Sequence, residues 1–132
     1  MHMRLVVGGC GQGKLDWLRR HTGEAYGEAE SVADGETCRE EELYRCRVLC
    51  RFHCLVRREL LAGREPEQLI DRMVEKNPGI WIISDEIGSG IIPAERAERE
   101  YRERTGRLLC QLAARAQEVY RVVCGLGRKL KG

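Results

Sequence analysis

The chain has 132 residues, of which 42% are hydrophobic and 33% charged, and this composition predicts one soluble globular domain. Lys and Arg number 23 against 21 Asp and Glu, so the charge balance gives no reason to expect nucleic acid as a partner, and no apolar run approaches the roughly 20 residues of a membrane span. Seven cysteines at irregular spacings, without an export signal, indicate reduced thiols and a cytoplasmic protein.

Hydrophobic periodicity and turn residues divide the chain into alternating strands and helices. The segment 38–63 looks like one long helix, because its apolar residues recur at spacings of three and four. In chain order we expect a strand at 4–9, a helix at 13–21, a short strand ending near Asp34, the helix at 38–63, a helix at 66–77, a buried strand at 79–86, a helix from Pro93 to about Gln117, a strand at 118–125 and an edge strand after it. This alternation predicts an α/β domain with a mostly parallel sheet of four to six strands.

A glycine-rich stretch, GGCGQGKL at 8–15, lies between the first strand and the first helix. It satisfies the G-x-x-x-x-G-K part of the P-loop pattern, in which backbone N–H groups and a helix N-terminus surround phosphate oxygens. We therefore expect the loop to bind a nucleotide through Gly8, Gly9, Cys10, Gly11, Gln12, Gly13 and Lys14. The next residue is Leu15, which lacks the Mg²⁺-binding hydroxyl of that pattern. The alternative is a glycine-rich turn with an incidental lysine.

Carboxylates follow two of the predicted strands. Asp85 and Glu86 end the buried strand at 79–86, and Asp34 ends a shorter one. Ligands of open α/β sheets bind at this edge, so these side chains could position Mg²⁺ or act as a base; we favour Glu86 and Asp34 as catalytic residues beside Lys14. The alternative is that strand-end acids only cap the following turns.

The residues Cys46, Cys50, His53 and Cys54 raise the question of a metal site. Cys46 and Cys54 lie about 12 Å apart along a helix, too far to share one ion. Buried packing, or packing between copies of the chain, explains these residues better, and we expect no resident metal ion.

The last third of the chain contains the most specific patterns. DEIGSGIIP (85–93) is similar to N-E-V-G-x-G-I-V-P, and QEVYRVVCGL (117–126) to A-D-E-V-x-x-V-V-x-G. With Gly106-Arg107, the glycine loop and Asp34…Thr37, they resemble the adenosylcobinamide kinase / adenosylcobinamide-phosphate guanylyltransferase family of cobalamin biosynthesis. The resemblance implies a P-loop, RecA-like three-layer domain over residues 1–132 that binds GTP or ATP and a cobinamide-type corrinoid. It also implies a homo-oligomer, plausibly a trimer, with the segment 38–63 as a candidate contact and Arg107 near the substrates.

The chain also departs from this family. Its members are longer between the first helix and the Asp34 strand, where they carry the histidine that is guanylylated, and nothing between His21 and Asp34 resembles that segment. The family's G-R-x-N-Q is Gly106-Arg107-Leu108-Leu109-Cys110 here. These differences predict that guanylyl transfer through histidine is lost, whereas kinase activity remains open. The alternatives are a non-catalytic nucleotide- or corrinoid-binding relative that regulates or scaffolds another enzyme, and a P-loop phosphotransferase with a different acceptor.

Overall fold

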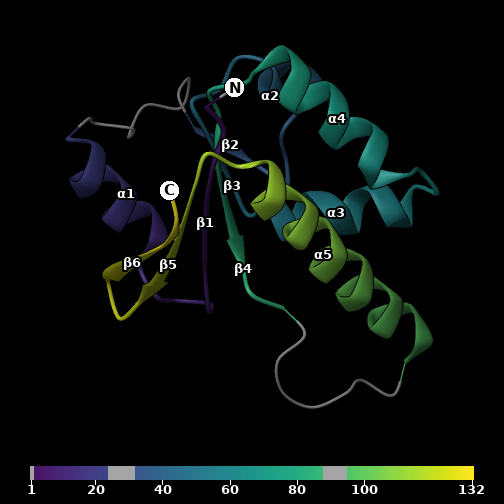
Figure 1. Cartoon of the computed structure of the whole chain (residues 1–132). Coiled ribbons are helices and arrows are strands. Elements are labelled where there is room, and N and C mark those ends of the chain that lie inside the picture. The colour runs from purple at the N-terminus through teal and green to yellow at the C-terminus, as the bar shows by residue number, and fades with distance from the viewer. Residues whose placement is uncertain (1, 24–31, 88–94) are drawn as a thin grey trace.

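The computed structural model describes residues 2–23, 32–87 and 95–132. A six-stranded sheet in the order β2-β3-β4-β1-β5-β6 carries α1 on one face and the other helices on the opposite face (Figure 1). The strands are β1 (Arg4–Gly8), β2 (Val32–Asp34), β3 (Val48–Cys50), β4 (Trp81–Asp85), β5 (Glu118–Val123) and β6 (Leu126–Lys131). The helices are α1 (Lys14–Thr22), α2 (Glu40–Leu43), α3 (Phe52–Leu61), α4 (Pro66–Lys76) and α5 (Arg96–Arg115).

The five strands β2, β3, β4, β1 and β5 are neighbours in that order and run parallel, whereas β6 pairs with β5 in the antiparallel direction. This arrangement confirms the predicted α/β class and the mostly parallel sheet. In β1 and β4, Gly8 and Asp85 are register partners. The carboxyl ends of these two neighbouring strands therefore lie side by side, which is where open parallel sheets bind ligands.

Each face of the sheet has its own apolar cluster, because successive side chains of a strand point to opposite faces. Leu5 and Ile82 belong to the cluster beneath the helices α2 to α5. Val6 and Ile83 belong to the cluster beneath α1, with Leu18 from that helix. The central strands are covered on both faces, as their nearly continuous apolar sequences predict.

The predicted helix over 38–63 is wrong. The structure has α2, β3 and α3 there, with Val48 and Leu49 completely buried in a strand between β2 and β4. Arg51 has φ 54° and separates β3 from α3. The apolar residues of α2, β3 and α3 lie mostly in the core, and their combined spacing in the sequence resembles that of one helix by coincidence. Because they are mostly core residues of one molecule, the single apolar helix that we named as a candidate contact between copies is not there.

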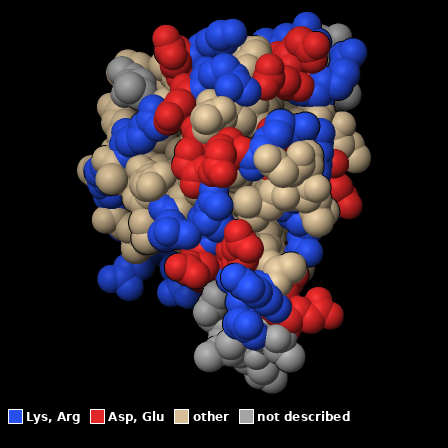
Figure 2. All heavy atoms as spheres, turned by 90° about the vertical axis from the view of Figure 1, so that its right-hand side faces the viewer, with Lys and Arg blue, Asp and Glu red and all other residues tan. Residues whose placement is uncertain are grey.

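Ion pairs join the helices that lie against one another. The face that carries α3, α4 and α5 shows basic and acidic side chains interspersed, without a large area of one sign (Figure 2). The inter-helix pairs there include Arg57–Glu98, Arg104–Glu67 and Arg115–Asp71. In the described part of the chain, no helix combines the length and apolar character needed to cross a bilayer.

Candidate functional site

The glycine-rich loop connects β1 to α1 and has the backbone geometry that its glycines permit. Gly11 and Gly13 take φ 74° and φ 80°, in the left-handed region that side chains disfavour. Gly8 is constrained differently: a Cβ atom there would lie 2.5 Å from the carbonyl oxygen of Val122. The loop therefore needs glycine for a tight turn and for a close approach to β5.

The hairpin turn between β5 and β6 holds the loop from outside. The side-chain oxygen of Gln12 accepts a hydrogen bond from the backbone N–H of Cys124 at 2.6 Å, and its carbonyl oxygen accepts one from Gly125 at 2.9 Å. Cys124 and Gly125 both have positive φ, as a two-residue hairpin turn requires. Cys10 is exposed at the tip of the loop. Gln12 thus fixes the shape of the loop in this structure.

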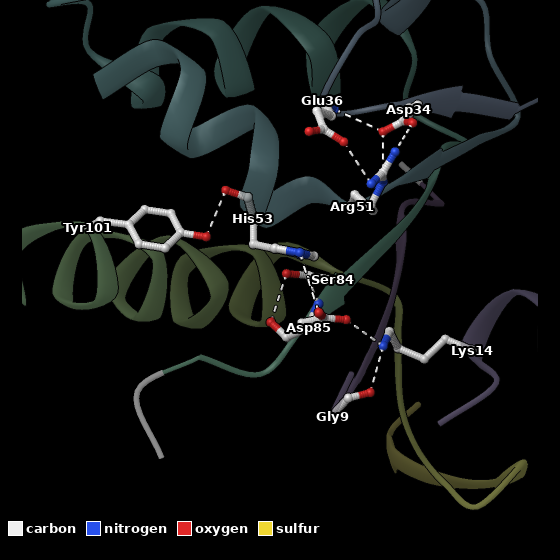
Figure 3. Close-up of polar contacts among 9 residues, drawn as sticks. All are labelled: Gly9, Lys14, Asp34, Glu36, Arg51, His53, Ser84, Asp85 and Tyr101. Atoms are coloured by element: carbon white, nitrogen blue, oxygen red, sulfur yellow. Dashed lines mark hydrogen bonds and ion pairs between the residues drawn. The ribbon is translucent and has the colours of Figure 1, made fainter. Parts of the chain in front are cut away.

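Lys14 begins α1, and its side chain is only 9% exposed. Its ammonium group donates to the carbonyl oxygen of Gly9 at 2.9 Å and to Oδ1 of Asp85 at 2.7 Å (Figure 3). The amine thus lies between the loop and the end of β4. A phosphate group held by the loop would meet this amine, and Asp85 would then lie close to the same phosphate.

His53 completes this group from the first turn of α3, which lies inside the segment that we predicted as one long helix. Its Nδ1 accepts a hydrogen bond from the backbone N–H of Asp85 at 3.2 Å, which leaves the proton of a neutral ring on Nε2. Nε2 lies 3.4 Å from Oδ2 of Asp85. Burial lowers the pKa of His53; Asp85 opposes this shift, and the nearby charge of Lys14 adds to it. The imidazole is therefore neutral at pH 7, with its N–H facing the carboxylate.

Asp34 forms a second charged group at the same edge of the sheet, at the end of β2. Both of its carboxylate oxygens accept hydrogen bonds from the guanidinium of Arg51, which also pairs with Glu36 (Figure 3). Burial raises the pKa of Asp34, but the hydrogen bonds from Arg51 and from the backbone N–H of Glu36 outweigh burial and lower it. The Asp34 carboxylate is ionised and fully engaged by Arg51.

The remaining predicted residues lie apart from Lys14. Glu86 pairs with Arg121 of β5 at 2.9 Å, and its backbone N–H donates to the carbonyl oxygen of Gly8. Arg107 is 62% exposed on α5, 3.9 Å from Glu103. Residues 88–93 of the DEIGSGIIP stretch lie outside the described residues.

A pocket of about 310 Å³ lies over the start of α1 and the ends of β3 and β4. Lys14 and Asp85 meet in its wall, and Arg51 contributes a second cation. Its lining residues are Gly11, Gly13, Lys14, Leu15, Asp16, Cys50, Arg51, Ile83, Ser84 and Asp85. No group of three or more His, Cys, Asp or Glu residues among 2–23, 32–87 and 95–132 is arranged to hold a metal ion by itself.

The model of the family described as cobinamide kinase / cobinamide phosphate guanyltransferase matches residues 48–130, which is more than half of the chain. The chain belongs to this family. The bifunctional adenosylcobalamin biosynthesis protein CobU of Escherichia coli (strain K12) is 46% identical over 52 residues, and the protein of the same name from Salmonella typhimurium (strain LT2) is 44% identical over 52 residues. Each match covers 39% of this chain and 29% of the relative. The cobinamide kinase family resemblance seen in the sequence is confirmed.

The sequence points to both Lys14 and Asp85, and the structure brings these two side chains together. The prediction favoured Glu86 over Asp85, but the side chain of Glu86 pairs with Arg121 instead, because successive residues at a strand end point to opposite sides. His53 and Arg51 were missed because the strand before them was taken as helix. Recognition of Val48-Leu49-Cys50 as a buried strand would have placed both residues just beyond a strand end.

Proposed function

We propose that this cobinamide kinase family member binds a purine nucleoside triphosphate, GTP or ATP, through a P-loop formed by Gly8, Gly9, Cys10, Gly11, Gln12, Gly13 and Lys14. Residues 1–132 act as one nucleotide-binding domain in this proposal. The observation that carries it is the position of the Lys14 ammonium, buried between the loop carbonyl of Gly9 and the carboxyl end of β4. An amine in that position can bind phosphate oxygens that the loop N–H groups also reach.

The reaction that the family suggests is transfer of a phosphoryl group to a hydroxyl of a cobinamide-type corrinoid. In phosphoryl transfer the protein mainly positions the reactants and neutralises charge. Lys14 supplies charge, and the pocket beside it has room for the transferred group and Mg²⁺. We assign Glu86, Asp34 and Arg107 roles around this centre: Asp34 fixes Arg51 at the pocket wall, Glu86 ties β4 to β5, and Arg107 meets the substrate at the outer face of α5.

Guanylyl transfer through a histidine is not part of this proposal. The segment that carries that histidine in the family has no counterpart between His21 and Asp34. The proposal includes self-association into a homo-oligomer, with a trimer as the expected form, and size-exclusion chromatography with light scattering tests it.

A second candidate function is binding without catalysis, in which the chain regulates or scaffolds another enzyme of the pathway. Leu15 favours it, because the loop lacks the hydroxyl that ligates Mg²⁺ in active P-loop enzymes. The kinase binds a nucleotide and turns over, whereas the scaffold binds a nucleotide or a corrinoid without turnover, so turnover separates the two candidates.

The test is incubation of the purified chain with cobinamide and Mg·ATP or Mg·GTP, followed by chromatography of the corrinoid. Phosphorylated corrinoid that disappears in Lys14→Ala, with the variant still folded by circular dichroism, supports the kinase. Nucleotide binding without product supports the scaffold instead. If calorimetry detects no binding of either nucleotide at millimolar concentration, the kinase is wrong, and if cobinamide does not bind either, both candidates are wrong.

A further inference from the structure

The start of α1 has few side-chain oxygen ligands for a cation that accompanies a nucleotide. Leu15 packs partly buried against the apolar cluster beneath α1 and has no oxygen. The N-cap of α1 is Gly13, which has no side chain. Asp16 is 72% exposed and lies 3.7 Å from Arg19. A Mg²⁺ ion between the phosphates and the protein must therefore find its ligand on another element.

We infer that Asp85 is the side chain that binds the Mg²⁺ of a bound nucleoside triphosphate, in place of the hydroxyl that is absent at Leu15. This inference rests on the proposed nucleotide binding. Asp85 ends β4, the neighbour of β1 in the sheet, and its Oδ1 lies 2.7 Å from the ammonium of Lys14. In P-loop NTPases an aspartate outside the loop joins the loop hydroxyl in holding Mg²⁺.

The other carboxylates at this edge are engaged elsewhere. Asp34 accepts both arms of the Arg51 guanidinium, and Glu86 faces Arg121. Asp85 differs because its partner is Lys14, whose ammonium group would pair with the oxygens of a bound phosphate. When the ammonium moves to phosphate, Oδ1 of Asp85 becomes available at the pocket.

Charge then requires a cation at this place. A phosphate in contact with Lys14 brings negative oxygens close to the Asp85 carboxylate, and like charges at such distances repel strongly in a partly buried site. A Mg²⁺ ion between them removes the repulsion, since it prefers one or two carboxylates together with phosphate oxygens and water. This ligand set also fits the lack of an all-protein metal cluster among the described residues.

His53 orients the carboxylate for this task. Its Nδ1 is fixed by the backbone N–H of Asp85, so its Nε2–H faces Oδ2 and leaves Oδ1 toward Lys14 and the pocket. The main chain of His53 is itself held, because its carbonyl oxygen accepts a hydrogen bond from the hydroxyl of Tyr101 at 3.1 Å (Figure 3). His53 is a positioning residue: it holds Asp85 and does not touch the metal.

The test is calorimetric binding of a non-hydrolysable GTP or ATP analogue to the full chain, with EDTA and then with Mg²⁺. For the wild type we expect Mg²⁺ to tighten binding at least tenfold. For Asp85→Asn we expect tighter binding than wild type in EDTA, because repulsion is removed and Lys14 is released, and loss of most of the tightening by Mg²⁺. Asp16→Asn is the matched control, a carboxylate of the same pocket without contact to Lys14, and it should respond to Mg²⁺ like the wild type.

Two further variants keep the test decisive. Asp85→Glu retains the charge and should keep part of the response to Mg²⁺, which gives a result even if Asp85→Asn folds poorly. Leu15→Ser combined with Asp85→Asn restores a hydroxyl at the start of α1 and should recover the response. An electron paramagnetic resonance titration with Mn²⁺ and the analogue should show tight Mn²⁺ in the wild type and not in Asp85→Asn.

The inference is overturned if Asp85→Asn and the wild type tighten equally with Mg²⁺, or if Asp16→Asn loses the response instead. Wild-type binding in EDTA that Mg²⁺ does not change overturns the metal site and leaves the proposed nucleotide binding intact. Absence of wild-type binding under every condition overturns both.

Discussion

The pair formed by Lys14 and Asp85 should contribute measurably to the stability of the protein without nucleotide. Lys14→Met removes the charge and retains most of the buried aliphatic chain, whereas Asp85→Asn keeps the shape of the carboxylate. We expect Lys14→Met to lower the free energy of unfolding by about 1–3 kcal/mol, because the Asp85 carboxylate loses its ammonium partner. Asp85→Asn should cost less, since Lys14 retains its hydrogen bond to the carbonyl oxygen of Gly9.

The expected coupling between the two residues follows from their burial. Fully exposed pairs contribute about 0.2–1 kcal/mol, and breaking a fully buried pair by removing one partner costs about 3–5 kcal/mol. The side chains of Lys14 and Asp85 are 9% and 24% exposed and meet at 2.7 Å. We therefore place their interaction between these limits, at about 1–2 kcal/mol.

Urea unfolding of the wild type, both single variants and the double variant measures this coupling as a double-mutant cycle. The pair Glu103–Arg107 is the control, because its side chains are 71% and 62% exposed and 3.9 Å apart; its coupling should not exceed about 0.5 kcal/mol. A coupling between Lys14 and Asp85 within error of zero, or no larger than the control, would refute the reasoning.

Three further predictions concern other parts of the molecule. In urea unfolding, Gly35→Ala should lower the free energy of unfolding by about 1–3 kcal/mol, because the new Cβ would lie 2.1 Å from the carbonyl oxygen of Arg51. Gly79→Ala is the control: its Cβ would meet no atom within 4 Å, so it should be nearly neutral in the same assay. Hydrogen bonds from Tyr120 and Arg4 lower the pKa of Glu118 to about 2 from its ordinary 4.5. The stabilising effect of the Glu118 carboxylate is therefore present above pH 4.5 and is lost as the pH falls toward 2. In urea unfolding, Glu118→Gln should lower the free energy of unfolding by about 1–2 kcal/mol at pH 7 and by progressively less below pH 4.5; an equal cost at pH 7 and pH 3 would contradict this. With a thiol reagent at pH 8, the exposed Cys10, Cys110 and Cys124 should react first. Burial raises the pKa of Cys46 to about 12 and of Cys50 to about 11, so these two thiols should react more slowly than the three exposed ones. Labelling of Cys46 or Cys50 as fast as the exposed thiols would contradict this prediction.

The local signals in the sequence were sufficient for most of the fold. Gly8 and Gly13 bound the loop, Pro66 begins α4, and the run Trp81–Asp85 forms the central β4, all as the patterns predict. These features depend on neighbouring residues, so a single sequence reveals them. The family resemblance, which depends most on the patterns after residue 84, implied the same α/β fold class.

The error at β3 has a physical cause that the sequence does not display. Val48, Leu49 and Cys50 form a strand because β2 and β4 lie on either side of them. Those partners are distant in the chain, and tertiary pairing overrides a helical spacing of apolar residues. The same error hid His53, whose contact with Asp85 joins positions 32 residues apart.

Nucleotide binding by the glycine-rich loop is the central claim, and isothermal calorimetry with GTP and with ATP in the presence of Mg²⁺ tests it most directly. The account predicts saturable binding of at least one nucleotide by the wild type and a loss of at least tenfold in affinity in Lys14→Ala. Absence of binding at millimolar nucleotide, or equal affinity of the folded Lys14→Ala variant, would contradict it.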